Sequence, residues 1–515
     1  MALASTQTAT VEGVHAHPVT VEANVGPGLP GMHMVGLGDA AVKESRERIR
    51  TAIANASLSW PRTKIMVSLS PAHLPKAGSH FDLPVAVAVL GSLDPRAQRR
   101  LRSTMLVGEL ALDASLRRVE AILPMLLQAR LRPDIETIVI PRANAREAAL
   151  LGDPRIVMAD SLSQVWSWLI DGPLLEPVDP HAIDSTGPSD THAAGASAAP
   201  DFRDIAGQAH ERAAFEVAAA GGHHVMMVGP PGSGKSMLAE RLPSILPPLN
   251  QHERIECTSL HQAAGIARGE VVTGRPFIAP HPSLTKAMLL GGGPHTPLPG
   301  AVSQAHHGVL FLDEASEIPA RVLDTLRIPL EQHEVRLTRG KRTVVFPAQF
   351  QLILAANPCP CGREPEQCRC HPSERARHLA NISGPLRDRL DVFVRTTAAS
   401  AVLSPQDAEP SAVIAQRVAQ ARERAAHRWR NAGCSARTNT QVASTLIRRD
   451  FPADETGMVF LANRLSHGEL TQRGVDKVLK LAWTLADLEE APVPDIDHVA
   501  RACEMHAPQP EEHAA

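Results

Sequence analysis

The chain lacks several residue types and patterns, and each absence limits what it can be. It contains no tyrosine, and aromatic residues make up only 3% of its 515 positions, so any aromatic stacking on a ligand must come from phenylalanine or tryptophan. No apolar run approaches the roughly 20 residues of a membrane-spanning helix. The first residues lack the basic start and apolar stretch of a signal peptide. Seven cysteines, an odd number, do not indicate a disulfide framework. These absences favour a cytoplasmic protein without a membrane partner.

A large net charge of either sign is also absent. The formal net charge is −3, which argues against a protein that coats nucleic acid over its whole surface. A basic patch confined to one part of an assembly is compatible with this value. The length of 515 residues predicts three or four domains, each able to bury its own core.

The apolar patterns divide the chain into four segments. Residues 1–170 mix strand and helix patterns. Residues 171–200 are rich in Pro, Ser, Thr, Gly and Ala without a period, which predicts a flexible linker. Residues 201–395 alternate strands and helices, as a parallel sheet requires, and residues 396–515 show helical periods typical of a lid. We therefore expect a multidomain α/β protein.

A glycine-rich loop in the third segment fits the Walker A spacing G-x-x-x-x-G-K-[ST]. It lies between an apolar run and a helical pattern, where backbone N–H groups and a helix N-terminus face a triphosphate. Lys235 is placed to reach the β- and γ-phosphates, and the Ser236 hydroxyl to ligate Mg²⁺. A plain strand–helix connector is disfavoured by the full pattern, so the chain is expected to bind ATP or GTP. The loop comprises Gly229, Pro230, Pro231, Gly232, Ser233, Gly234, Lys235 and Ser236.

Two further apolar strands end in polar residues suited to nucleotide hydrolysis. The strand 308–312 is followed by Asp313 and Glu314, a Walker B pattern. Asp313 is expected to hold Mg²⁺, directly or through water, and Glu314 to orient and polarise the attacking water. The strand 352–356 ends in Asn357, which looks like the sensor 1 residue of AAA+ ATPases, set between the two Walker strands.

The segment 383–391 resembles the part of AAA+ ATPases that carries the arginine finger. Arg389 is the candidate, reaching into a neighbouring subunit to neutralise charge in the transition state. The alternative is an intrachain ion pair with Asp388 or Asp391. If Arg389 acts in trans, the protein must form a ring or at least a dimer.

Over nearly its whole length the chain resembles the magnesium-chelatase-like AAA+ ATPases of the YifB and ComM kind. The resemblance is carried by Gly-Leu-Pro-Gly at 28–31, Met-Val-Gly-Leu at 34–37, Leu-Pro-Lys at 74–76, Phe-Asp-Leu-Pro at 81–84, Phe-Pro-Ala at 346–348 and Ser-Gly-Pro at 383–385. It implies a hexameric ring that hydrolyses ATP with Mg²⁺ and acts on single-stranded or branched DNA as a branch-migration helicase in natural transformation.

The same resemblance assigns further nucleotide contacts and a fold. Arg473 resembles the sensor 2 arginine of the lid, and Ile205 and Gly207 belong to a motif that folds over adenine. The implied architecture is an N-terminal Lon protease-like (ribosomal S5 domain 2-like) α+β domain, a P-loop AAA+ α/β core and a C-terminal helical lid. Where relatives commonly show paired histidines after Arg-Pro-Phe, this chain has Ile-Ala-Pro-His at 278–281.

The N-terminal domain does not keep the catalytic pair of a Lon protease. By an approximate alignment, the nucleophile position falls near Asp82 and the lysine position within 122–125. Lys76 and Ser79 lie nearby in the sequence, but a Ser–Lys dyad needs both members in place. We therefore expect a structural or ring-assembly role and no protease substrate.

A predicted hairpin at 334–346 has its turn near Gly340 and carries a cluster of cations. The cations are Arg336, Arg339, Lys341 and Arg342. In the AAA+ clade that the chain resembles, a hairpin before sensor 1 projects into the pore, where cations track a phosphate backbone. A solvated hairpin tip is the alternative. The stretch 275–293, which ends in three glycines, resembles the second pore insert.

Four of the seven cysteines fall within a dozen residues as two Cys-x-Cys pairs, in a possible insert at 358–371. They are Cys359, Cys361, Cys368 and Cys370. Such a set can form a tetrathiolate zinc site, and free thiols are the alternative. Zinc would have a structural role, holding the loop between Asn357 and the Arg389 segment.

Three functional classes fit these observations. The leading one is a DNA-translocating ATPase. The second is the motor subunit of a metal chelatase, against which stands the N-terminal domain that precedes the ATPase. The third is a protein-remodelling AAA+ ATPase. The missing Ser–Lys dyad argues against protein cleavage by this chain.

Overall fold

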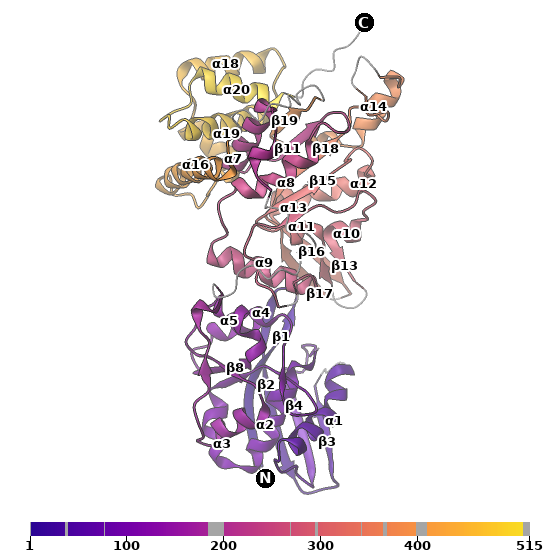
Figure 1. Cartoon of the computed structure of the whole chain (residues 1–515), viewed down its shortest axis with the longest axis vertical. Coiled ribbons are helices and arrows are strands. Elements are labelled where there is room, and N and C mark those ends of the chain that lie inside the picture. The colour runs from indigo at the N-terminus through magenta and orange to yellow at the C-terminus, as the bar shows by residue number, and fades with distance from the viewer. Residues whose placement is uncertain are drawn as a thin grey trace. The chain divides into compact units, whose positions relative to one another are not determined.

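The structure is a computed structural model that describes residues 2–36, 40–76, 78–183, 200–267, 269–293, 297–340, 342–363, 368–397 and 409–507. It divides the chain into two compact units, drawn in Figure 1. The first unit combines the described part of Met1–Ala194 with Asn250–Thr273 and Gly340–Val345. The second unit contains the remaining segments, including the Walker A loop.

The first unit is built on a mixed eight-stranded sheet with the strand order β10-β9-β8-β5-β1-β2-β4-β3. The long strands β1 and β2 pair antiparallel from Ala2↔Val25 to Glu12↔His15, whereas β3 runs parallel to β4 and β8 parallel to β5. Val19, Val21 and Ala23 alternate along β2 and are fully buried, as on the inner face of a half-buried strand. The strands are β1 (Ala2–Glu12), β2 (His15–Gly26), β3 (Gly31–Val35), β4 (Lys64–Ser70), β5 (Thr104–Leu106), β8 (Thr137–Pro141), β9 (Ile156–Ala159) and β10 (Glu176–Pro177).

Helices cover this sheet. Helix α2 is almost wholly buried, consistent with a sequence that is apolar all round rather than amphipathic. The helices are α1 (Ala40–Asn55), α2 (Asp82–Leu93), α3 (Pro95–Arg102), α4 (Ile122–Arg130), α5 (Ala145–Ala149) and α6 (Leu162–Leu169), and a small sheet pairs β6 (Glu109–Leu110) with β7 (Leu116–Arg117).

Two boundaries differ from the sequence expectation. Residues 171–183, placed in the linker, contain β10, which pairs antiparallel with β9 and extends the sheet; residues 184–199 lie outside the described part. Helix α9 (Gln251–Ala263) was expected in the ATPase core but belongs to the first unit. Its Ile255 joins the apolar core around α4, and Gln251 Nε2 donates to the Leu150 carbonyl at 2.6 Å. Both differences come from contacts distant in sequence, which local composition does not report.

The second unit contains a five-stranded parallel sheet with the order β12-β15-β18-β11-β19. Alternate side chains of each strand point to opposite faces. In β11, Val225 and Met227 enter one apolar core, and Met226 enters the other. The strands are β11 (Val225–Val228), β12 (Phe277–Ile278), β15 (Val309–Leu312), β18 (Gln351–Ala356) and β19 (Val392–Arg395). Helix α7 (Ala209–Gly221) precedes the first of these strands, and the helices between them include α8 (Lys235–Ile245), α11 (Ala301–Gln304), α12 (Ala320–Leu323), α13 (Arg327–Gln332), α14 (Pro372–Ala380) and α15 (Gly384–Arg387).

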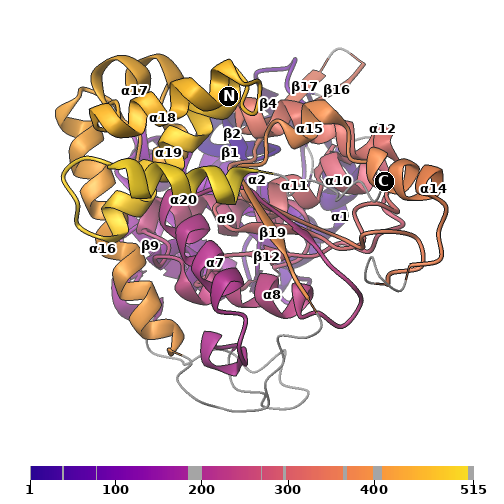
Figure 2. The same cartoon turned by 90° about the horizontal axis from the view of Figure 1, so that it is seen from above.

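The C-terminal segment is helical, as its periodicity predicted. Figure 2 shows its helices gathered beside the five-stranded sheet. Trp429 and Trp483 meet Phe451 edge to face with ring centroids 5.0 and 6.2 Å from it, which anchors the core of this helical region. The helices are α16 (Ser411–Asn431), α17 (Ser444–Asp450), α18 (Glu455–Ser466), α19 (Gln472–Leu488) and α20 (Ile496–His506).

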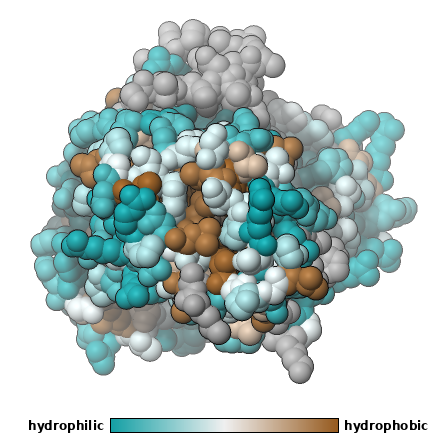
Figure 3. All heavy atoms as spheres, turned by 90° about the horizontal axis from the view of Figure 1, so that it is seen from below, coloured by the Kyte–Doolittle hydropathy of each residue, from teal (hydrophilic) through white to brown (hydrophobic). Residues whose placement is uncertain are grey.

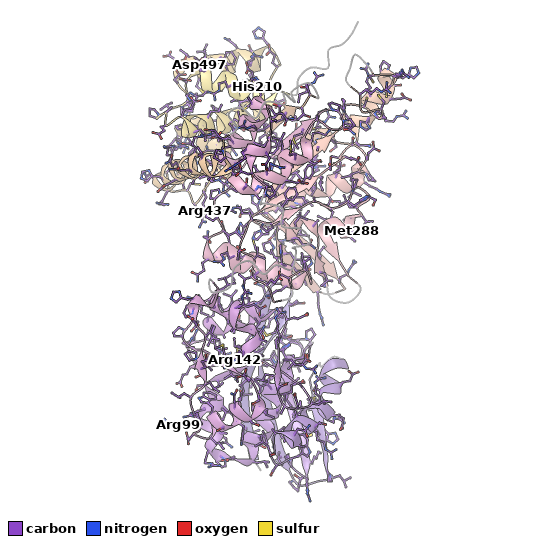
Figure 4. All side chains as sticks on the ribbon, viewed as in Figure 1. Arg99, Arg142, His210, Met288, Arg437 and Asp497 are labelled. Carbon is purple, nitrogen blue, oxygen red and sulfur yellow. The ribbon has the colours of Figure 1, made fainter. Side chains whose placement is uncertain are left out.

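Large apolar side chains are exposed at scattered positions along the described chain. Among the described helices, none is long and apolar enough to cross a membrane. The face in Figure 3 shows hydrophobic side chains near its centre, surrounded by hydrophilic ones. Leu3 and Leu29 are among the exposed apolar residues of the first unit. Figure 4 shows the side chains on the ribbon, including Arg99 on α3 and Met288 in the second unit.

Candidate functional site

The Walker A loop joins β11, a central strand, to the N-terminus of α8. Lys235 is buried, and its Nζ donates to the carbonyls of Gly229 and Pro230 at 2.7 and 2.8 Å. Burial lowers the pKa of Lys235, while the charges of Asp313 and Glu314 act in the opposite direction. The backbone carbonyls of the loop therefore hold the Lys235 ammonium group in place.

A hydroxyl at the start of α8 meets a carboxylate that follows β15. Ser236 Oγ donates to Asp313 Oδ2 at 2.8 Å, and the Glu314 amide donates to Asp313 Oδ1 at 2.8 Å. Glu314 is exposed and has a φ of 49°, in the left-handed region that non-glycine residues rarely occupy. Such conformations cluster at functional sites.

Asn357 completes this group of side chains. It follows β18, which lies between β15 and β11 in the sheet, and its Oδ1 accepts a hydrogen bond from Lys235 Nζ at 3.2 Å. The structure thus brings together the loop lysine, the loop serine, Asp313 and Asn357 from three adjacent strands. All lie at the carboxyl ends of parallel strands, where ligands of open α/β sheets bind.

These residues fit a magnesium nucleotide. Gly232 and Gly234 have φ values of 77° and 82°, and a Cβ on Gly232 would meet no atom within 4 Å, so the loop faces open space there. A serine hydroxyl and a carboxylate are oxygen ligands of the kind Mg²⁺ takes. The first N–H groups of α8 have no partner within the helix and are available to phosphate oxygens.

Two residues that support the loop were not found from the sequence. Thr396, after β19, is fully buried, and its Oγ1 lies 2.6 Å from Ser233 Oγ. A Cβ on Gly229 would lie 2.0 Å from the same Oγ1, so that position requires glycine. Gln208 Nε2 donates to the Ser233 carbonyl at 2.7 Å. The only signal for Thr396 was its place directly after a strand. Gln208 lies directly before a helix, at the end of the adenine-motif-like segment 204–208.

The segment 204–208, for which the sequence suggested a contact with adenine, ends at Gln208. Ile205 is fully buried, whereas Gly207 is exposed with a φ of 65°. Gln208 is also left-handed, with a φ of 51°, and its Oε1 is buried without a hydrogen-bond partner among the described residues. The polypeptide therefore turns sharply next to the Walker A loop, and it leaves one buried acceptor there.

Arg389 and Arg473 do not contact the Walker residues within the described chain. Arg389 forms an ion pair with Glu331 of α13 and donates to the Pro385 carbonyl. Its partner is thus neither Asp388 nor Asp391, the two that the sequence suggested. Arg473 is largely exposed, and its Nη1 lies 3.9 Å from Asp388 Oδ2. Asp388 is adjacent to Arg389 in the sequence, so both candidate arginines belong to, or contact, the segment 383–391.

A buried polar cluster links that segment to helix α19 of the C-terminal helical region. Asp391 lies 3.3 Å from Lys477 Nζ and 3.4 Å from His223 Nδ1, and it accepts from the His224 amide at 3.3 Å. Burial by itself raises the pKa of Asp391, but the His223 bond and the Lys477 charge hold that pKa well below its usual range. Burial lowers the pKa of His224 to about 4, and its Nδ1 accepts from the Leu352 amide at 3.1 Å. This histidine pair thus serves packing and hydrogen bonding.

The predicted hairpin is present as the two-stranded sheet of β16 (Glu334–Arg339) and β17 (Arg342–Pro347), with Gly340 at a φ of 57°. Arg336, Arg339 and Arg342 are exposed, and Arg336 pairs with Glu334. Lys341 lies outside the described residues.

The glycine insert packs beside β16. This insert, predicted at residues 275–293, contains β12, α10 (Lys286–Leu290) and β13 (Gly291–Gly292). Strand β13 pairs antiparallel with β14 (Leu298–Pro299), which follows the insert. A Cβ on Gly291 would lie 3.1 Å from Leu337 Cδ1, and one on Gly292 would lie 3.7 Å from Arg339 Nη2. Met288 of α10 is 53% exposed. The two predicted pore elements are therefore neighbours.

The four clustered cysteines are brought together. Their Sγ atoms all lie within 4.8 Å of one another. Cys359 is buried, and Cys361 is exposed. Backbone N–H groups of Arg363 and Arg369 lower the pKa of the Cys361 thiol to about 6.

The N-terminal domain places its polar residues in separate contacts. Asp82 is buried and bonds Arg48 Nε at 2.6 Å; burial raises its pKa to about 6 against the opposing effect of Arg48. Lys76 Nζ donates to the Pro71 carbonyl, and Ser79 Oγ donates to Glu109. Lys76 and Ser79 are each bonded elsewhere, which does not favour a dyad. Residues 122–125 begin the apolar helix α4.

The parallel sheet and the loop at its carboxyl edge define a P-loop ATPase of the AAA class. Family models described as magnesium chelatase, subunit ChlI, match residues 201–402, and the C-terminal part of that subunit matches residues 408–506. A model described as subunit ChlI of Mg-chelatase matches residues 21–144. Because this last match covers the N-terminal domain, that domain no longer argues against a chelatase motor.

Curated relatives match along the whole chain. An uncharacterized protein of Mycobacterium tuberculosis is 44% identical over 506 residues, 98% of each chain. The uncharacterized protein YifB of Escherichia coli is 35% identical over 515 residues, 98% of this chain and 97% of its own. Competence protein ComM of Haemophilus influenzae is 36% identical over 502 residues, 95% of this chain and 94% of its own. The chain belongs to the magnesium-chelatase ChlI-like family of AAA ATPases, and membership implies ATP hydrolysis with Mg²⁺.

Proposed function

We propose that this protein is a ring-forming, ATP-driven motor that translocates on single-stranded or branched DNA and promotes branch migration. The observation that supports this most directly is the exposed arginine hairpin, which lies beside the glycine insert. A relative that bears the name competence protein supports a place in DNA uptake or recombination.

The nucleotide site supplies the energy for this motor. Ser236 and Asp313 hold Mg²⁺, Lys235 binds the phosphates, and Glu314 orients water for attack on the γ-phosphate. Asn357 positions that water from the strand between the two Walker strands. The support is the 2.8 Å contact of Ser236 with Asp313 and the 3.2 Å contact of Lys235 with Asn357.

The ring is proposed from Arg389. Its guanidinium pairs with a largely exposed carboxylate, that of Glu331, which a neighbouring subunit could displace. In a hexamer, Arg389 then reaches the nucleotide of the next subunit and stabilises transition-state charge. Arg473 approaches the γ-phosphate from the lid, and its proximity to Asp388 connects the lid with this segment.

DNA contact is proposed for Arg336, Arg339, Lys341 and Arg342. Exposed guanidinium groups on a hairpin neutralise phosphates and release counterions, which gives binding without sequence preference. The N-terminal domain, for which we propose a Lon-like fold, supports ring assembly and does not cleave protein.

The test is the steady-state ATPase rate of the purified full chain without DNA, with single strands and with a four-way junction. We expect DNA to stimulate hydrolysis, and the Arg339→Ala/Arg342→Ala variant to lose most of that stimulation. The double variant should also reduce the salt dependence of DNA binding by a log–log slope of about 2. Arg99→Ala/Arg102→Ala on α3 removes the same charge from an exposed helix and should leave stimulation intact.

A rate that is indifferent to every DNA, with hydrolysis itself intact, would overturn the DNA motor. It would favour the second candidate, a chelatase-type motor subunit, which the family descriptions support. Stimulation by an unfolded protein in place of DNA would favour a protein-remodelling ATPase.

A further inference from the structure

The four clustered cysteines lie next to the nucleotide site, and their geometry suits one metal ion. In a tetrahedral thiolate site with a Zn–S bond of about 2.3 Å, neighbouring sulfurs are about 3.8 Å apart. The Sγ–Sγ distances here are 3.2 Å for Cys359–Cys361, 3.8 Å for Cys361–Cys368 and 3.5 Å for Cys359–Cys368. With Cys370, all four sulfurs stay within 4.8 Å.

The same cluster argues against other uses of the thiols. A disulfide has a sulfur–sulfur bond near 2.05 Å, and all four cysteines are free. Ligands of an iron–sulfur cluster bind different irons and are spread more widely.

The loop that carries these cysteines touches two parts of the nucleotide site. Asn357 is the first residue after β18, and Cys359 follows two residues later. Gly362, with a φ of 70°, packs so closely on Pro231 of the Walker A loop that a Cβ there would lie 2.9 Å from Pro231 Cδ and Cγ.

Beyond Cys370 the chain enters α14, which leads back to the Walker B side. His371 is the N-cap of α14, and Asn381, just after the helix, donates from Nδ2 to the Ser316 carbonyl at 2.6 Å. Ser316 lies three residues after Asp313. The cysteine loop therefore connects the sensor 1 strand, the Walker A loop and the Walker B turn.

We propose that Cys359, Cys361, Cys368 and Cys370 bind one Zn²⁺, and that this zinc site holds Asn357 and Pro231 in the geometry that nucleotide binding needs. Binding replaces thiol protons with the metal and involves no change of oxidation state. The proposal that the cysteines bind zinc does not depend on any role in DNA transport. The proposal that zinc affects the nucleotide site rests on the proposed function only in that the Walker A loop binds a nucleotide.

The first experiment measures zinc in the full chain purified without chelators. We expect about one zinc per chain, lost in Cys361→Ser with the far-ultraviolet circular dichroism unchanged. Cys434→Ser removes a thiol outside the cluster and should keep its zinc. Cobalt added to metal-free protein should give the sulfur-to-cobalt charge-transfer absorption of a tetrathiolate site. A chain that contains no zinc and gives no such absorption with cobalt would overturn the proposal. One iron per chain in place of zinc would overturn the identity of the metal.

The second experiment separates the metal from its coupling. Cys361→Ser should weaken binding of a fluorescent ATP analogue about tenfold. Gly362→Ala keeps all four thiols but disturbs the contact with Pro231, so it should retain zinc and weaken the analogue about fivefold. If both variants bind the analogue as the wild type does while wild-type zinc is present, the coupling is wrong and the zinc is only structural. ATPase stimulation by DNA is a separate readout, so its failure would not affect this result.

Discussion

Replacing Lys477 by methionine removes the ammonium group that faces the buried Asp391. Side-chain exposures are 16% for Lys477 and 11% for Asp391, and their charged atoms are 3.3 Å apart. Removing one member of a buried ion pair costs about 3–5 kcal/mol because the other charge stays buried. His223 and the His224 amide still contact Asp391. We therefore expect a loss near the lower end, about 3 kcal/mol.

Urea unfolding followed by tryptophan fluorescence measures this loss, because Trp483 lies on the same helix as Lys477. A loss of about 3 kcal/mol should move the midpoint by about 1 M urea or more. Arg449→Met breaks an exposed pair, with Arg449 79% exposed, and should change stability by no more than about 0.5 kcal/mol. If Lys477→Met costs no more than this control, the cluster does not join lid and core as described.

The pH dependence gives a second check on the same pair. The pKa of Asp391 is lowered in the folded protein, so its contribution to stability is present above the unfolded value of about 4 and is lost as the pH falls below it. Lys477→Met lowers that contribution. The stability difference between wild type and variant should therefore narrow below about pH 4, and a gap that widens on acidification would contradict the assignment.

Three further predictions concern the nucleotide site. Glu314→Gln should bind a fluorescent ATP analogue normally while steady-state hydrolysis falls at least about 100-fold; near-normal turnover would refute the role of Glu314. Arg389→Ala should reduce hydrolysis about 1,000-fold. Mixing it with Glu314→Gln subunits should restore part of the rate, because mixed rings contain complete sites, and no recovery would exclude action in trans. Gln208→Ala removes the bond to the Ser233 carbonyl and should weaken the ATP analogue about fivefold, which corresponds to about 1 kcal/mol; an unchanged dissociation constant would show that Gln208 does not support the loop.

The sequence predicted those parts of the site that depend on short spacing. The Walker A loop, the acids after a buried strand and the asparagine after another are local patterns, and parallel strands bring their carboxyl ends to one edge. For that reason Asp313 and Asn357 could be placed beside Lys235 before any coordinates were known. The cysteine pairs are likewise local, and their sulfurs converge as expected.

Partners contributed by distant elements could not be predicted. Thr396 carries no pattern of its own, and Gln208 was only the last residue of the adenine-motif-like segment 204–208. Their contacts with Ser233 depend on how β19 and the start of α7 are placed. Glu331, the partner of Arg389, lies 58 residues away in α13, whereas the sequence suggested only adjacent acids. From the sequence, helix α9 was placed in the ATPase core and strand β10 in the linker for the same reason. Composition does not show that a segment packs against a core formed by another part of the chain.

The position of α9 affects the order in which the protein folds during synthesis. The apolar core around α4 includes Ile255, so this core is incomplete when residue 183 has been made and must wait until α9 ends at residue 263. At about 5–20 residues per second, those 80 residues take roughly 4–16 s. During that interval the surface that α9 later covers is exposed to the ribosome and its chaperones. A fragment that ends near residue 200 would keep that surface uncovered permanently.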